Sequence, residues 1–128
     1  MGLDIKEKII SVDWLKYSGP EYYDPEEMVE SLIHLSSHNE SRARHGLDHK
    51  VLSAVGNNHA GTYYPAILEA ADLLIEMEQS SELEKVRKCA YCILNNLYYF
   101  QPDVSNYKDH SYEHILSFVR EKLSDYSD

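Results

Sequence analysis

Apolar residues recur every three to four positions along most of the chain, which is the spacing of an amphipathic helix. The clearest example follows Asp24 and Pro25, where a capping side chain precedes a proline at the first helical position. Apolar residues then stand at Met28 and at four and seven positions after it. This pattern predicts a first helix that begins at Asp24–Pro25 and ends near His38.

The same spacing predicts four more helices. We place them at residues 40–55, at residues 65–79, from Ser80 or Ser81 to residue 100, and at residues 111–123. Residues 1–11 are predicted to be a loose lead-in, and a short turn around Trp14 follows. No stretch alternates between apolar and polar residues with a period of two, so we expect no sheet. The 128 residues fit a single all-α domain of about five helices.

Short motifs recur at a spacing near 40 residues. Asn57-Asn58 and Asn95-Asn96 are 38 residues apart, and the three Tyr-Tyr pairs are spaced by 41 and 35 residues; the pairs begin at Tyr22, Tyr63 and Tyr98. This period, with two helices per unit, is typical of HEAT-like solenoids, in which stacked helix pairs bury each other's apolar faces. We therefore predict a short α-solenoid of antiparallel helix pairs; the alternative is coincidence in a chain with 11 tyrosines.

Antiparallel packing also predicts where these motifs lie. The start of the first helix, the loop after the second and the loop after the fourth would all fall at the same end of the stack. We call the corresponding residues 22–23, 56–64 and 98–107 the tyrosine-rich edge. Tyrosines there could form a binding patch with amide groups, or could close the end of the core.

The formal net charge is −10, with 22 acidic and 12 basic residues. This charge argues against nucleic acid or an anionic membrane as the partner, because both are bound by neutralising phosphates. It suits a basic protein partner, although acidity also serves solubility. No run of 18 apolar residues and no signal-peptide pattern occurs, so we expect no membrane span and a cytoplasmic location.

Acidic residues cluster on the outer faces of two predicted helices. Residues 26–30 hold three glutamates, and residues 69–78 hold Glu69, Asp72, Glu76 and Glu78. Each cluster is either a solvated face or a surface that attracts a basic partner.

Residues that could bind a metal or take part in catalysis give weaker signals. Three histidine pairs are spaced at i,i+4, a spacing that can hold zinc, but there is no HExxH motif and no third ligand is indicated. The pairs are His34/His38, His45/His49 and His110/His114. Cys89 and Cys92 are expected to pack in the core. His59 lies in a loop without an evident nucleophile beside it, so we expect no catalysis, no cofactor and no bound metal.

Two segments carry a family resemblance. WLKYSGPEYYDP at residues 14–25 and VGNNHAGTYYP at residues 55–65 resemble a group of bacterial HEAT-like proteins. Members occur beside polymorphic toxins, including those of contact-dependent growth inhibition, as immunity proteins. The resemblance implies a cytoplasmic protein that binds one cognate toxin domain and occludes its active site. Many such toxins are basic nucleases, which agrees with the acidic charge.

The expected function is thus that of an immunity protein. The alternatives are a generic HEAT-like scaffold for another protein, and a metal-binding or hydrolytic protein that uses the histidine pairs and His59. The candidate toxin-binding residues lie on the tyrosine-rich edge and on the first helix: Tyr22, Tyr23, Asp24, Glu26, Glu30, Asn58, His59, Tyr63, Tyr98, Asp103 and Tyr107.

Overall fold

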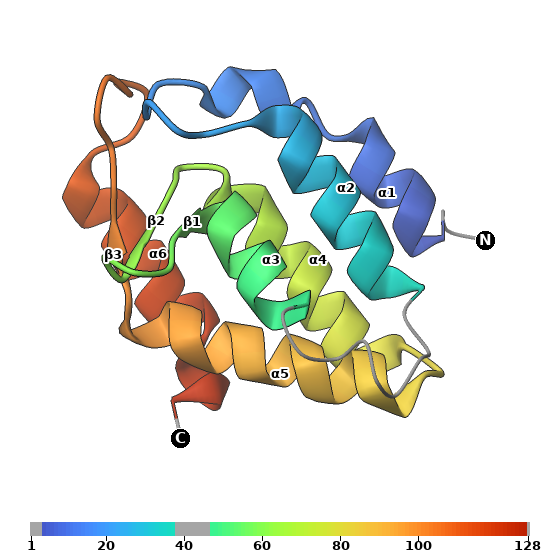
Figure 1. Ribbon diagram of the computed structural model, residues 1–128. Coiled ribbons are helices and arrows are strands. Elements are labelled where there is room, and N and C mark those ends of the chain that lie inside the picture. Colours follow the sequence, from blue (N-terminus) through green and yellow to red (C-terminus); the bar gives the residue numbers. More distant parts are fainter. Residues whose placement is uncertain (1–3, 38–46, 128) are drawn as a thin grey trace.

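The computed structural model describes residues 4–37 and 47–127, and its regular structure is mostly helical (Figure 1). The helices are α1 (Ile5–Ser11), α2 (Pro25–Ser36), α3 (Leu47–Val55), α4 (Ile67–Ser80), α5 (Glu84–Tyr99) and α6 (Tyr112–Lys122), with 3-10 turns η1 (Trp14–Tyr17) and η3 (Ser124–Tyr126). The all-α prediction is confirmed, and α2 to α6 correspond to the five predicted helices. The predicted stretch at residues 40–46 and the predicted end at His38 lie outside the described residues. None of the described helices is long and apolar enough to cross a membrane.

The helix boundaries follow local hydrogen bonding. Asp24 caps α2, because its Oδ1 accepts from the backbone N–H of Glu26 at 3.0 Å and of Glu27 at 3.4 Å. The predicted start of the fourth helix at Ser80 or Ser81 is wrong. Helix α4 continues through Ser80, and the Ser81 hydroxyl accepts from the N–H of Leu83, one residue before α5 begins.

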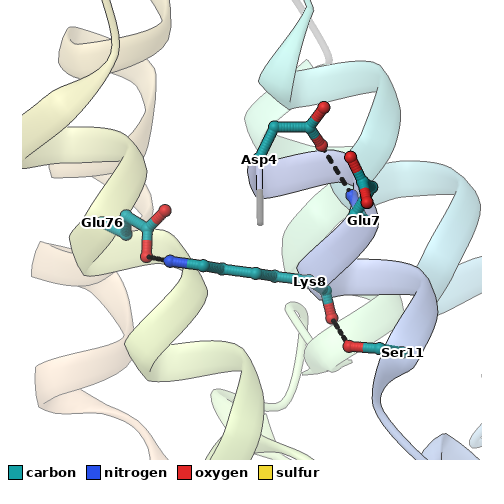
Figure 2. A network of polar contacts seen from close by, with 5 residues as sticks. All are labelled: Asp4, Glu7, Lys8, Ser11 and Glu76. Atoms are coloured by element: carbon teal, nitrogen blue, oxygen red, sulfur yellow. Dashed lines mark hydrogen bonds and ion pairs between the residues drawn. The ribbon is translucent and has the colours of Figure 1, made fainter. Parts of the chain in front are cut away.

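Residues 5–11 form helix α1, so the predicted loose lead-in is wrong. Asp4 caps the helix by accepting from the N–H of Glu7 at 2.8 Å, and Ile9 is fully buried. Lys8 Nζ reaches across to Glu76 Oε1 on α4 at 2.7 Å (Figure 2). A seven-residue helix with one fully buried side chain is too short to show a helical period in the sequence.

The predicted turn around Trp14 is confirmed as η1, and two buried hydrogen bonds fix it. Trp14 Nε1 donates to the carbonyl of Ile9 at 2.8 Å, which holds η1 against α1. The Tyr23 hydroxyl donates to the carbonyl of Trp14 at 2.8 Å, just before α2 begins. These bonds give α1, η1 and the start of α2 a defined relative position.

A small sheet joins the two long loops, so the expectation of no sheet is wrong. Strand β1 (Gly56–Asn57) pairs antiparallel with β2 (Thr62–Tyr63), and β2 pairs parallel with β3 (Gln101–Pro102). A Cβ on Gly56 would lie 1.9 Å from the Thr62 carbonyl oxygen, so only glycine lets β1 approach β2 this closely. Strands of two residues cannot display an alternating pattern, which explains the error.

Helix α5 contacts four other helices, α2, α3, α4 and α6. Consecutive helices pair, α2 with α3 and α4 with α5, as a repeated helix pair requires. However, α1 also contacts α4, and α6 contacts both α4 and α5. In Figure 1, α1 and α2 lie side by side at one end of the molecule and α6 lies at the other. In a solenoid each unit contacts only its neighbours, so the structure does not confirm a solenoid.

Candidate functional site

The three segments of the tyrosine-rich edge meet, as the sequence predicts. The sheet joins residues 56–63 to residues 101–102. The ring of Tyr23 packs edge-on against that of Tyr64, with centroids 5.7 Å apart, and Tyr17 lies 6.4 Å from Tyr107. The predicted edge is therefore real, and its side chains decide what it can do.

Most tyrosines of this edge belong to the core. Tyr23, Tyr63 and Tyr107, three of the candidate binding residues, are buried, and Tyr63 is 0% exposed. Burial raises the pKa of all three hydroxyl groups. Their rings therefore close the end of the core instead of forming an exposed aromatic patch, which corrects their assignment to a binding surface. Tyr22, at 77% exposed, remains accessible.

The polar candidates of this edge hold their own loops. Asn58 Nδ2 lies 2.9 Å from His49 Nδ1, and Asp103 Oδ1 accepts from the N–H of Ser105 at 3.0 Å. Tyr98 is half-buried, with the Arg120 guanidinium 5.4 Å from its ring centroid. His59 is exposed. These contacts give Asn58, Asp103 and Tyr98 structural roles.

The acidic cluster on α4 binds side chains from neighbouring elements. Glu69 accepts from the Tyr17 hydroxyl at 2.7 Å and pairs with Lys16 at 3.3 Å, which attaches η1. Glu76 pairs with Lys8 of α1 (Figure 2). Asp72 pairs with Lys122 of α6 at 2.7 Å, and Glu78 accepts from the Tyr126 hydroxyl of η3 at 2.6 Å. These four carboxylates brace the fold, which argues against this face as a surface for a basic partner.

An open groove of about 1000 Å³ lies between α2 and the segment formed by α1 and η1. We call it the α1–α2 groove, and it is lined by Ile10, Val12, Asp13, Trp14, Leu15, Asp24, Pro25, Glu26, Val29, Glu30, Ile33, His34 and Lys50. Ile10 is 60% exposed and Leu15 is 71% exposed. Large apolar side chains in a concave, open surface are typical of a binding site.

Helix α2 has one broad apolar face. Met28, Leu32 and Leu35 are fully buried in the core. Val29 and Ile33 are half-buried, stand four residues apart and line the groove. Both also pack against the core, so the groove is lined by the partly exposed margin of the apolar face of α2.

Four exposed carboxylates line the groove together with these apolar residues, and we call them its acidic rim. Asp24, Glu26 and Glu30, all candidate binding residues, lie on the α2 side, and Asp13 lies on the η1 side. Lys50 is the lysine among the lining residues. The groove therefore combines an apolar interior with an acidic rim, a combination that matches a basic amphipathic surface.

Four apolar groove residues were not predicted from the sequence: Ile10, Val29, Ile33 and Leu15. Ile10 falls in the segment expected to be loose, and Leu15 in a turn. Val29 and Ile33 stand next to core positions in the sequence and look like a broadened core face. The available signal was the unusual width of the apolar face on a helix that also carries three glutamates.

The histidine and cysteine candidates do not form a metal site among the described residues. Within residues 4–37 and 47–127, no group of three or more His, Cys, Asp or Glu side chains could hold a metal ion. His110 and His114 stack at 4.8 Å, and His110 Nδ1 lies 3.0 Å from the Tyr107 hydroxyl. His38 and His45, which complete the other two pairs, lie outside the described residues. Cys92 is exposed, so its predicted place in the core is wrong, while Cys89 is half-buried.

The chain was compared with models of known protein families, with curated proteins and with solved structures, and none of the three comparisons gave a match.

Proposed function

We propose that this protein binds a basic protein domain and neutralises it in a stoichiometric complex, as an immunity protein neutralises its toxin. The observation that carries the proposal is the α1–α2 groove, where exposed Ile10 and Leu15 lie within a rim of carboxylates. The resemblance of residues 14–25 and 55–65 to HEAT-like immunity proteins supports the kind of partner. The first of these segments contains Trp14, Leu15 and Asp24, which line the groove.

The apolar groove residues give a first estimate of affinity. Complete burial of an Ile, Leu or Val side chain contributes about 1.5–3 kcal/mol. Burial of Ile10 and Leu15 would thus contribute about 3–6 kcal/mol before the costs of association, whereas a nanomolar complex needs about 12 kcal/mol. Tight neutralisation therefore also requires polar and ionic contacts around the groove.

Charge supplies the complementary part of recognition. The rim carboxylates and the net charge of −10 attract a basic domain and disfavour acidic proteins and nucleic acids. Such steering raises association rates by about 10- to 1000-fold at low ionic strength. The association rate with a basic toxin should therefore fall as salt is added, because surface charges are screened beyond about 10 Å at 0.1 M salt.

Co-expression with the product of the adjacent upstream gene tests this function. We expect a stable one-to-one complex in size-exclusion chromatography and recovery of growth in cells that make the toxin. The absence of both the complex and the growth recovery would overturn the proposal.

Two matched variants test the binding face. Leu15 lies in the groove and Tyr22 on the tyrosine-rich edge, and both are highly exposed, so replacement by glutamine should leave the fold intact. We expect Leu15→Gln to weaken the complex at least about tenfold, equivalent to about 1.4 kcal/mol. Tyr22→Gln should change it less than about twofold. The reverse result would assign binding to the tyrosine-rich edge.

A further inference from the structure

We infer that the α1–α2 groove takes a single amphipathic helix of the partner, with an apolar stripe flanked by lysine or arginine. This inference rests on the proposed function and specifies the part of the partner that the groove recognises. It follows from the dimensions of the groove, from the kind of backbone in its walls and from the charge of its rim.

The dimensions fit a helix. The groove residues of α2 extend from Pro25 to His34, which is about 13.5 Å at 1.5 Å per residue. A helix with its side chains is about 10 Å wide, so a helical segment of about 13.5 Å occupies a cylinder of about 1060 Å³. The groove measures about 1000 Å³. The groove is therefore of a size that suits one helix of a partner, contacted over about two and a half turns.

The walls exclude two other modes of peptide recognition. Strand addition needs an unpaired strand edge, but the walls come from α1, η1, α2 and α3 with a short connection between α1 and η1. The polyproline mode needs a groove lined with exposed aromatic rings. Trp14 is the aromatic residue of this lining, and it is only 4% exposed. The mode that remains is a helix seated in the groove, whose apolar side chains at positions i, i+3, i+4 and i+7 contact the groove.

The apolar anchors lie on both walls. Val29 and Ile33 form one row along α2, and Ile10 and Leu15 face the groove from the α1–η1 side. A helix seated between them would bury one apolar stripe against both rows, as two packed helices do. Leucine or isoleucine at the partner's anchor positions matches the aliphatic character of the groove.

The rim sets the charge of the occupant. Asp13 stands on one side of the groove, and Asp24, Glu26 and Glu30 stand on the other. A helix with basic residues on both flanks of its apolar stripe would place a cation near each wall. A second copy of this acidic chain would instead bring like charges together, which disfavours self-association through this face.

Synthetic peptides test the inference with the full chain. The probe is a fluorescein-labelled peptide of 18 residues built from leucine, alanine and lysine, with leucines at helical i, i+3, i+4 and i+7 spacing and lysines beside them. One control peptide has the same composition with leucines at every second position, and another has glutamate in place of lysine. Fluorescence anisotropy gives the affinities, and circular dichroism reports helix formation.

We expect the first peptide to bind with gain of helix, and both control peptides to bind at least about tenfold more weakly. The double variant Leu15→Gln with Ile10→Gln, which changes two highly exposed groove residues, should weaken the first peptide at least about tenfold, whereas Tyr22→Gln should leave its affinity unchanged. Equal binding of the peptides, no binding of any, or indifference to the double variant would overturn the inference. A concentration-dependent dimer that Leu15→Gln abolishes would also overturn it, because a second copy would then fill the groove.

The two proposals can fail separately. If the toxin complex forms and Leu15→Gln disrupts it while no peptide binds, the groove binds the toxin through something other than a single helix. If the amphipathic peptide binds but the upstream gene product neither binds nor is neutralised, the helix site stands and the immunity function fails.

Discussion

Two buried tyrosines of the tyrosine-rich edge differ in what their hydroxyl groups contact. The Tyr23 hydroxyl donates to the Trp14 carbonyl at 2.8 Å, whereas the Tyr63 hydroxyl has no hydrogen-bond partner among the described residues. Tyr23→Phe should therefore lower the free energy of unfolding by about 1–2 kcal/mol, because it removes a buried hydrogen bond to the Trp14 carbonyl. Tyr63→Phe should be neutral or should raise it by up to about 1 kcal/mol, because it removes an unpaired buried hydroxyl.

Urea denaturation of the two variants measures both changes under identical conditions. Each substitution removes a single oxygen from a buried ring, so the difference between the variants isolates the hydrogen bond. An equal loss in both variants would mean that the Tyr63 hydroxyl also makes a stabilising contact.

The sequence showed that these tyrosines recur, but it could not show which of them are buried. Tyrosine suits both situations, because its ring packs in a core while its hydroxyl can reach a polar atom. Tyr22 and Tyr23 are neighbours in the sequence, yet one is 77% exposed and the other is buried. Tertiary contacts, such as the ring of Tyr64 against Tyr23, decide this difference.

At the level of elements, helix α2 combines a structural role and a proposed binding role at its N-terminus. Asp24 caps the helix and also contributes a carboxylate to the rim of the α1–α2 groove. Asp24→Ala removes both and should lower the free energy of unfolding by about 1 kcal/mol. Asp24→Asn keeps a capping oxygen and should cost only a few tenths of a kcal/mol, because Asn caps about as well as Asp.

Both Asp24 variants lose the same charge, so both should slow association with a basic partner to a similar extent. Thermal unfolding and stopped-flow association rates separate the two roles. If Asp24→Asn destabilised the protein as much as Asp24→Ala, the carboxylate charge at the helix N-terminus would matter more than the capping bond.

The predictability of an element depended on its length. Helices α4 and α5, of 14 and 16 residues, repeat their apolar spacing several times, so the sequence predicts them. Helix α1, with seven residues, and the two-residue strands are too short to repeat such a spacing, so the sequence does not predict them. The groove was missed for the same reason: one of its walls is built from α1 and η1, the elements with the weakest sequence signal.

At the level of the whole molecule, buried tyrosines make stability depend on alkaline pH. Burial raises the pKa of six tyrosine hydroxyls above the ordinary value of 10, with hydrogen bonds to glutamate contributing at two of them; the six are Tyr17, Tyr23, Tyr63, Tyr64, Tyr107 and Tyr126. Above pH 10 the unfolded chain loses these protons while the folded chain keeps them. The unfolded state then binds fewer protons, so the free energy of unfolding decreases as pH rises.

Each such tyrosine lowers the free energy of unfolding by at most about 1.4 kcal/mol per pH unit above pH 10, so six contribute up to about 8 kcal/mol per unit. A domain with a typical stability of about 5–15 kcal/mol should therefore unfold cooperatively between about pH 10 and pH 12, with little contribution from these groups below pH 9. Absorbance at 295 nm should show exposed tyrosines ionising gradually, then a steep step that coincides with loss of helical circular dichroism. If all 11 tyrosines ionised in one gradual step while the helical signal persisted, their hydroxyls would be accessible to solvent in the folded protein.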